Sequence, residues 1–187
     1  MAQIDIEHAE KEFDKYLRDF DLGNPKILLK KVHTYGVVKA ADYICTREEL
    51  KPEDRDLALL IALLHDIGRF EQLKAYNSYD DNRFDHARFG VKLLFEEGKI
   101  KDFISCRDYD EVIRQAIALH SVYRLPEIQD PGVLLHCRVI RDADKLDNFR
   151  VKLTDSIEVL LGCSGEEAGS QEISPKTWEE CTRRSSI

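Results

Sequence analysis

Apolar residues recur every three or four positions through most of the chain, which is the spacing of one face of an α-helix. No stretch alternates apolar and polar residues as a half-buried β-strand would. The predicted helices cover residues 4–20, 25–46, 51–64, 86–98, 108–120 and 133–161, the last with a candidate break near Asn148. The pattern therefore predicts an all-α fold, built as a single-domain helical bundle.

The segment from Leu57 to Leu64 is apolar on nearly every side, so we expect it to be the central helix, surrounded by the others. Gly68 follows shortly afterwards and is interpreted as the end of that helical stretch. Residues 74–85 are polar and aromatic without a clear period. We interpret them as a loop that lies over a functional site.

From Gly162 onward the chain is polar and contains Gly165, Gly169 and Pro175. This change in composition sets the expected domain boundary at residue 161. We expect one helical domain over residues 1–161, because 187 residues suit a single domain. Residues 162–187 are expected to form a polar tail that is mobile or a truncated end.

The pattern of cysteines and apolar runs favours a cytoplasmic protein. The five cysteines are scattered and form no CxxC pair, which fits free thiols in a reducing compartment. The first residues are charged and amphipathic rather than typical of a signal peptide. The longest apolar run, LALLIALL, is too short to cross a bilayer, so no membrane partner is expected.

The overall charge narrows the class of partner. A formal net charge of -8 argues against a protein that grips the backbone of a nucleic-acid polymer, because such proteins carry a basic face. It is compatible with a small phosphorylated substrate such as a nucleotide, because bound divalent metals would reverse the local sign of the charge.

Ionisable side chains interrupt otherwise apolar helix faces in several separate segments. These side chains include enough imidazoles and carboxylates to form a complete set of metal ligands. The candidate metal ligands are His33, His65, Asp66, His86, His120 and Asp144. A buried His or Asp is costly unless it is paired or bound to a metal, so their recurrence on inward faces indicates a metal centre. The alternative is that each one is separately hydrogen-bonded in the core.

The last predicted helix shows which aspartates face the core. Asp144 and Asp147 continue its apolar stripe, whereas Asp142 lies two residues from Asp144, roughly 200° around the helix. Asp142 is therefore expected to point away. His8 lies beside acidic residues and His136 lies off the apolar stripe, so both are interpreted as structural.

The order His33, His65-Asp66, Asp144 resembles the HD-domain metal-dependent phosphohydrolase superfamily. The local sequences fit it as well, with an apolar helix that ends in HDIG and an ADKLD segment on a late helix. The similarity covers roughly residues 25–155, which would be the metal-binding core. The resemblance implies an all-α fold and a divalent metal held by His33, His65, Asp66 and Asp144.

His86 and His120 resemble the two added histidines of the binuclear branch of that superfamily, the H…HD…H…H…D branch. This branch includes cyclic-di-nucleotide phosphodiesterases, symmetrical dinucleoside-tetraphosphate hydrolases and a few di-iron oxygenases. The resemblance implies two divalent metal ions (Mn, Fe, Co, Ni or Mg) with Asp66 bridging them. The phosphodiesterases have HDIGK and a paired His-His where this chain has Arg69 and His120-Ser121, and their GYP motif is absent, which disfavours a cyclic dinucleotide.

Several residues are assigned candidate roles on this basis. Asp66 is placed where a bridging carboxylate could hold the attacking hydroxide, which makes it a candidate catalytic residue. Arg69 could bind a phosphate bidentately, the alternative being a surface salt bridge. Lys145 is a candidate phosphate contact, or else a solvated lysine, and Asp147 is a candidate partner that hydrogen-bonds a ligand histidine.

Three functions remain open at this point. The leading hypothesis is a metal-dependent phosphohydrolase that cleaves a phosphate ester or anhydride of a nucleotide or other small phosphorylated metabolite with a metal-activated hydroxide. The alternatives are an HD-type di-iron oxygenase and a non-catalytic ligand-binding HD module. The pattern leaves the oligomeric state open.

Overall fold

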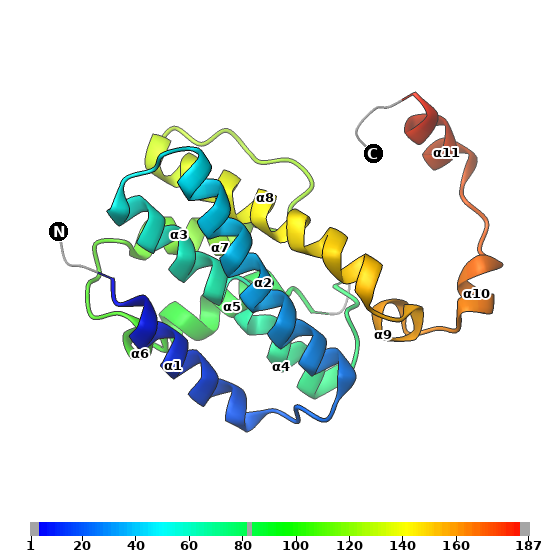
Figure 1. Cartoon of the computed structure of the whole chain (residues 1–187), viewed down its shortest axis with the longest axis horizontal. Helices are drawn as coiled ribbons and strands as arrows, with labels where there is room; N and C mark the ends of the chain where they lie inside the picture. Colours follow the sequence, from blue (N-terminus) through cyan, green and yellow to red (C-terminus); the bar gives the residue numbers. More distant parts are fainter. Residues whose placement is uncertain (1–3, 82–83, 184–187) are drawn as a thin grey trace. The chain divides into compact units, whose positions relative to one another are not determined.

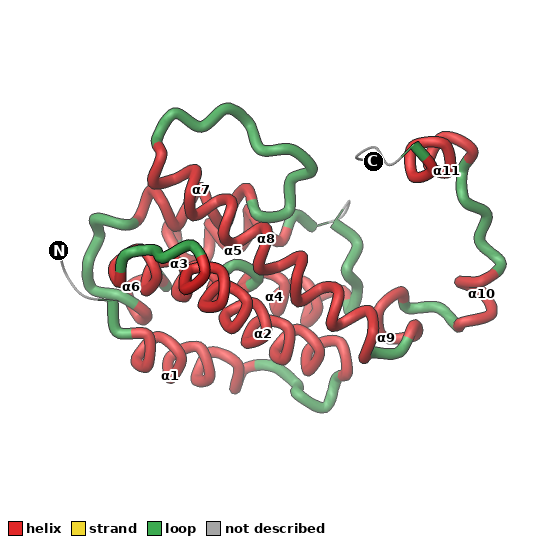
Figure 2. The backbone as a smooth tube through the Cα atoms, turned by 45° about the horizontal axis from the view of Figure 1, so that its top comes forward, coloured by secondary structure: helices red, strands yellow, loops and turns green. Residues whose placement is uncertain are grey.

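The computed structural model describes residues 4–81 and 84–183, and these residues form helices and loops without a strand (Figures 1 and 2). The all-α prediction is confirmed. The α-helices are α1 (Ile6–Tyr16), α2 (Pro25–Arg47), α3 (Pro52–Leu64), α4 (Ile67–Tyr76), α5 (His86–Val91), α6 (Ile100–Phe103), α7 (Asp110–Leu119), α8 (Pro131–Thr154), α9 (Ile157–Leu161), α10 (Gly165–Gly169) and α11 (Pro175–Thr182). A 3₁₀ turn, η1 (Leu17–Asp19), follows α1, and a π-helical turn, η2 (Lys92–Glu96), follows α5.

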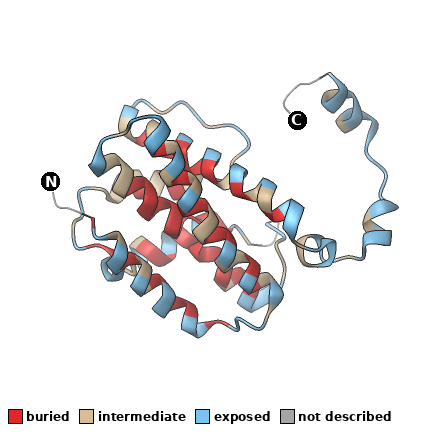
Figure 3. Cartoon of the chain, in the orientation of Figure 1, coloured by how far each residue is buried: buried red, intermediate tan, exposed pale blue. Residues whose placement is uncertain are grey.

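Helix α3 forms the centre of the bundle, as the sequence predicts. Every residue from Leu57 to Leu64 is buried, and Figure 3 shows the buried side of the neighbouring helices turned toward it. Helices α2 and α8 pack against α3 and against each other. Each fully buried leucine stabilises the fold by about 1.5–3 kcal/mol. This helix is therefore a well-packed support for the residues that follow it, His65 and Asp66.

Side-chain caps explain where two site-bearing helices begin. Asn24 caps α2 by accepting a hydrogen bond from the backbone N–H of Lys26, and Pro25 occupies the first helical turn. Asp85 caps α5 by accepting from the backbone N–H of Arg88, so that His86 is the first residue of that helix.

Gly68 does not end a helix, contrary to the sequence interpretation. The chain turns at His65 and Asp66 and then resumes as α4, so the loop expected at 74–85 begins only at Asn77. A Cβ atom on Gly68 would lie 2.3 Å from the carbonyl oxygen of His86 and 2.6 Å from the backbone nitrogen of Gly90. Glycine is needed here because α4 and α5 touch backbone to backbone.

Two other helix boundaries differ from the sequence expectation. Helix α8 continues without a break through Asn148, whose side chain donates a hydrogen bond to Asp144 one turn earlier, and the helix ends at Thr154. The expected helix over 86–98 is instead the short α5 followed by η2. The four-residue helix α6 was not expected, because it is too short to show a period.

The chain divides into two compact units, Met1–Thr154 and Asp155–Ile187. Helices α9, α10 and α11 belong to the second unit, and none of its described residues is buried (Figure 3). A segment that buries no side chain contributes no hydrophobic core of its own. Within the described part of the chain, no helix is both long enough and apolar enough to cross a membrane.

Candidate metal centre

Five structural elements of the first unit bring the six candidate metal ligands together. Helix α2 carries His33, the turn between α3 and α4 carries His65 and Asp66, and α8 carries Asp144. The other two lie at helix ends: His86 begins α5 and His120 follows the last residue of α7. The four histidines and Asp66 are buried, and Asp144 is partly buried.

The first ligand group consists of His33, His65 and Asp144, with one oxygen of Asp66. Ligand atoms of His33, His65 and Asp144 all lie within 4.8 Å of one another. His33 Nε2 is 3.0 Å from Asp144 Oδ1, and His65 Nε2 is 3.6 Å from Asp66 Oδ2. Two ligands bound about 2.0–2.2 Å from one ion lie roughly 2.8–3.6 Å apart at the usual angles, so these separations suit one metal ion.

The second ligand group consists of His86 and His120 with the other oxygen of Asp66. His86 Nε2 lies 3.1 Å from His120 Nε2 and 3.3 Å from Asp66 Oδ1. His120 Nε2 lies 3.6 Å from the same Asp66 oxygen. Ligand atoms of His65, Asp66 and His120 also fall within 4.8 Å of one another, so the two groups adjoin.

Each of the four rings turns its Nδ1 atom toward an oxygen that accepts a hydrogen bond. His65 donates to the carbonyl of Ala62 and His120 to the carbonyl of Ile117, both at 2.7 Å. The other two rings face carboxylates, since His33 Nδ1 is 2.7 Å from Asp147 Oδ2 and His86 Nδ1 is 2.8 Å from Asp81 Oδ1. A proton on Nδ1 leaves Nε2 of a neutral ring with a lone pair, which is the form that binds a metal.

Two buried polar atoms at the heart of this cluster have no hydrogen-bond partner, namely His65 Nε2 and Asp66 Oδ1. Such atoms cost about 1–3 kcal/mol each unless something satisfies them. Burial lowers the pKa of His65 to about 4, so its ring is neutral near pH 7. Burial opposes ionisation of Asp66, yet the Lys30 ammonium holds the pKa of that carboxyl well below its ordinary range. A neutral imidazole and an ionised carboxylate therefore meet, and a divalent cation fits them.

Asp147 holds the His33 ring, as its place on the α8 stripe predicts. Its carboxylate also accepts two hydrogen bonds from Arg150, at 2.7 and 2.9 Å, which fix its orientation. A Cβ atom on Gly36 would lie 2.0 Å from Asp147 Oδ1, so the missing side chain leaves room for this carboxylate against α2. The spacing of Gly36, three residues after His33 on the same helix face, is the sequence signal for it.

Arg69 lies inside the centre rather than on the surface. The residue is 7 % exposed, and its guanidinium makes a bidentate ion pair with Asp81, at 2.7 and 3.2 Å. Its Nη2 donates to His86 Nε2 at 3.0 Å. Gln72 accepts from Arg69 and donates to the carbonyl groups of Asp80 and Phe84, which ties these two loop residues to α4. Asp81 and Gln72 escape sequence reasoning because neither belongs to a periodic face or a motif.

Lys30 is the other cation at the centre, and the sequence interpretation missed it. Its Nζ donates to Asp66 Oδ2 at 2.7 Å, and its side chain is only 14 % exposed. Lys30 lies three residues before His33, hence on the same face of α2, and this spacing is the signal that could have found it.

The remaining sequence assignments fall outside the ligand cluster. Lys145 is exposed, so the structure does not bring it into the cluster, and Asp142 is exposed as expected. His8 is exposed and bonds the carbonyl of Asp102. His136 is buried, although it lies off the apolar stripe, because α8 packs against α2, α3 and α7 and so buries a broad face. Its Nε2 lies 3.7 Å from Asp54.

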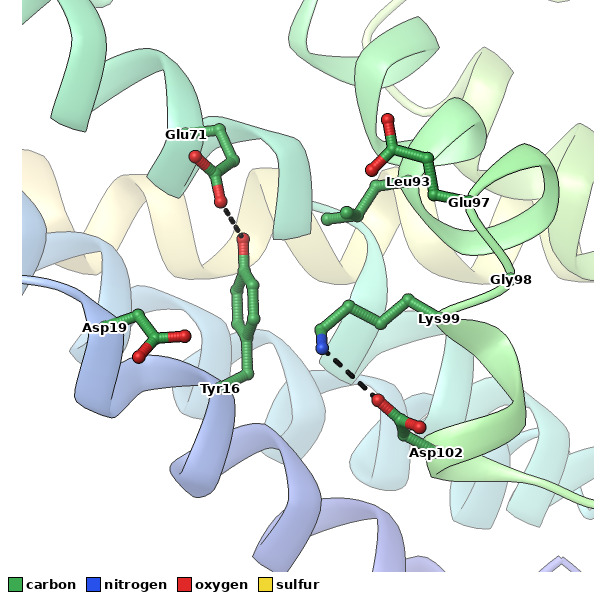
Figure 4. A pocket seen from close by; sticks show the side chains of 8 residues that line it. All are labelled: Tyr16, Asp19, Glu71, Leu93, Glu97, Gly98, Lys99 and Asp102. Carbon is green, nitrogen blue, oxygen red and sulfur yellow. Dashed lines mark hydrogen bonds and ion pairs between the residues drawn. The ribbon is translucent and has the colours of Figure 1, made fainter.

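A hollow elsewhere in the first unit is chemically unsuited to the same task. It has a volume of about 390 Å³ and is shown in Figure 4. Four carboxylates and one ammonium line it, and the ammonium of Lys99 is paired with Asp102 at 3.2 Å. Tyr16 donates to Glu71 across it at 3.4 Å. This lining repels anions and includes none of the six candidate metal ligands.

Comparison with known proteins agrees with this geometry. The chain shows no significant match to a curated protein or to a solved structure. The family model described as HD domain matches residues 32–148, which is more than half of the chain and spans every element that carries a candidate ligand. That family binds divalent metal with His and Asp side chains of an all-α fold. The chain therefore belongs to the HD domain family.

Proposed function

We propose that this protein is a binuclear metal-dependent phosphohydrolase that cleaves a phosphate ester or anhydride bond of a nucleotide or another small phosphorylated metabolite. HD domain proteins are mostly metal-dependent phosphohydrolases, which supports the reaction class. The observation that carries the proposal is the position of Asp66. Its Oδ2 faces the first ligand group and its Oδ1 faces the second, so one carboxylate serves both.

The second ligand group supports two ions rather than one. His86 Nε2 and His120 Nε2 face each other at 3.1 Å while both Nδ1 atoms face acceptors. Two lone pairs at that separation repel each other unless a positive charge lies between or beside them. The guanidinium of Arg69 satisfies His86 in part, but Asp66 Oδ1 remains unpartnered, and a cation bound by all three atoms would satisfy the whole group.

The residues divide the work of hydrolysis among them. When bound, divalent ions lower the pKa of a water molecule and polarise a phosphoryl oxygen. Asp66, whose two oxygens face the two ligand groups, would hold such ions side by side. In hydrolysis the water oxygen bonds to phosphorus, the bond to the leaving group breaks, and the leaving group takes up the proton that the water gives up. The Nη atoms of Arg69 are held by Asp81, Gln72 and His86. Its Nε–H has no hydrogen-bond partner and lies 3.9 Å from Asp66 Oδ1, so this donor can stabilise charge on a phosphoryl oxygen.

The cations beside the centre favour phosphate chemistry over the alternatives. Lys30 Nζ lies 2.7 Å from Asp66 Oδ2, and Arg69 Nε lies 3.9 Å from Asp66 Oδ1. An anionic substrate requires such groups, whereas a di-iron oxygenase acting on a neutral substrate does not. A non-catalytic ligand-binding module would need none of the unpartnered ligand atoms.

Metal replacement with a substrate panel tests the proposed reaction directly. Protein stripped of metal is expected to be inactive, and at least one of Mn, Fe, Co, Ni and Mg should restore phosphate release from a nucleotide or phosphomonoester. Inorganic phosphate and metal content are the measurements. Oxygen consumption restricted to the iron form would support the oxygenase instead, and a folded protein that takes up no metal would support the binding module.

Replacing His86 or His120 with asparagine tests the number of ions. Each variant is expected to fall from two metal ions per chain to one and to lose most hydrolysis, because both rings belong to the second ligand group. His136→Asn is the matched control, since His136 is equally buried but lies outside the centre. If the two rings only support the core, stability should drop by about 1–3 kcal/mol with unchanged metal content, as expected for the control.

Arg69→Gln is expected to lower kcat/KM by about 100-fold, because the variant loses a charged donor that acts on the phosphoryl oxygens. Metal content should remain at two ions per chain, as measured by elemental analysis beside the kinetics. Arg88→Gln serves as the control, since Arg88 lies on α5 with an exposed side chain and pairs with Asp85. Unchanged kinetics in the Arg69 variant would assign Arg69 to the support of His86 and Asp81 alone.

A further inference from the structure

We propose that Lys30 and Lys26 form a second anion subsite beside the metal centre, so that the substrate carries two adjacent phosphate groups. This inference rests on the proposed function and deepens it. The phosphate that is cleaved lies over the two ligand groups near Arg69, and the neighbouring phosphate lies on Lys30 and Lys26. The favoured substrates are therefore diphosphates and polyphosphates rather than monophosphate esters.

The position of Lys30 is the first support for this subsite. Its Nζ lies 2.7 Å from Asp66 Oδ2, so the ammonium is already at the edge of the centre. Its side chain is largely buried, and Asp66 is its only carboxylate partner among residues 4–81 and 84–183. A lysine ammonium has three donors, which leaves it able to hold a phosphate oxygen.

Tyr79 links Lys30 to the second lysine. The ammonium groups of Lys26 and Lys30 each lie 5.8 Å from the centre of the Tyr79 ring, and the guanidinium carbon of Arg69 lies 6.0 Å from it. The Tyr79 hydroxyl donates to the carbonyl of Lys26 at 3.1 Å, and its own carbonyl accepts from Arg69. Three cations thus lie around one aromatic side chain.

Lys26 and Lys30 share a face of α2, because they are four residues apart. Lys26 Nζ donates to the carbonyl of Asn77 at 2.8 Å, a neutral partner, and within the described chain no carboxylate neutralises it. The two lysines therefore form a row along α2, which leads from Lys30 at the centre to Lys26, whose charge no described carboxylate compensates.

Metal binding makes this charge excess larger. Asp66 is the carboxylate that pairs with Lys30, and it is also the carboxylate that faces both ligand groups. Once two divalent ions share Asp66, its negative charge no longer balances Lys30. Two lysines and two dications would then attract a ligand with more negative charge than one phosphate carries.

Non-hydrolysable phosphonates separate the two phosphate positions. Methylenediphosphonate and methylphosphonate would be titrated calorimetrically into the manganese-saturated protein and its Lys30→Gln variant. The unmodified protein should bind the diphosphonate at least tenfold more tightly. In Lys30→Gln, loaded with manganese to the same content as the unmodified protein, that preference should shrink by roughly tenfold, the size of one charge-assisted hydrogen bond, because diphosphonate affinity falls more than methylphosphonate affinity.

Two further variants make the assignment specific. Lys30→Arg should restore much of the preference, because it restores the charge. Lys31→Gln is the matched control: Lys31 is the next residue, pairs with Asp14 at 2.9 Å on the other side of the helix, and should leave both affinities unchanged. Lys26→Gln is expected to lower diphosphonate affinity by a smaller factor than Lys30→Gln, since Lys26 lies farther along the row.

The outcomes distinguish this proposal from the proposed function. Equal affinity for the two phosphonates, or an unchanged preference in Lys30→Gln, would overturn the subsite while phosphate release by the metal-loaded protein could still establish hydrolysis. A preference that depends on Lys30, in a protein that hydrolyses no phosphate compound, would support the subsite and contradict the hydrolase. Absence of bound manganese would contradict both.

Discussion

The structure depends on one buried carboxylate, that of Asp66, around which four imidazole rings and a lysine are arranged. Ionised and 3 % exposed, it would be prohibitively costly in an apolar core without compensation. Lys30 balances one oxygen, and the other oxygen has no hydrogen-bond partner. The Nδ1 hydrogen bonds of the histidines aim their Nε2 atoms at this carboxylate, so the centre is preorganised for cations before any arrive.

The helices explain how the centre keeps this geometry. The buried α3 ends at His65 and Asp66, so the two residues sit on the most rigid support of the bundle. Just after this turn, Gly68 lets α4 touch the backbone of α5. This close contact brings His86, the first residue of α5, beside Asp66. Helices α2 and α8 pack side by side and supply His33 and the pair Asp144 and Asp147. The contacts that hold these helices together therefore also position the candidate metal ligands.

Local periodicity was sufficient to predict the helical fold and the inward face of each ligand, because both follow from spacing along one helix. Periodicity did not predict the role of a residue whose contacts lie on another helix or turn. Gly68 looked like a helix end, yet its role depends on the carbonyl of His86, eighteen residues away. Lys30 escaped notice because a long flexible side chain takes its direction from a partner, here Asp66, on another element.

The same reason explains the unexpected surroundings of Arg69. Its position after HDIG suggested a phosphate-binding group or a surface salt bridge, whereas Asp81 and Gln72, from a loop and the next helical turn, enclose it. Neither residue could be assigned from spacing, since the 77–85 loop has no period. Arg69 is consequently a buried, oriented donor beside His86 rather than a mobile surface arginine, and this makes its placement part of the centre.

The central claim is that Asp66 bridges two metal ions, and electron paramagnetic resonance during a manganese titration of the metal-free protein tests it most directly. The account predicts that binding saturates at two ions per chain and that the second ion produces the signal of an exchange-coupled pair, because ions that share a carboxylate lie about 3.5–4 Å apart. Saturation at one ion, or two ions that give only the signal of isolated manganese, would contradict it.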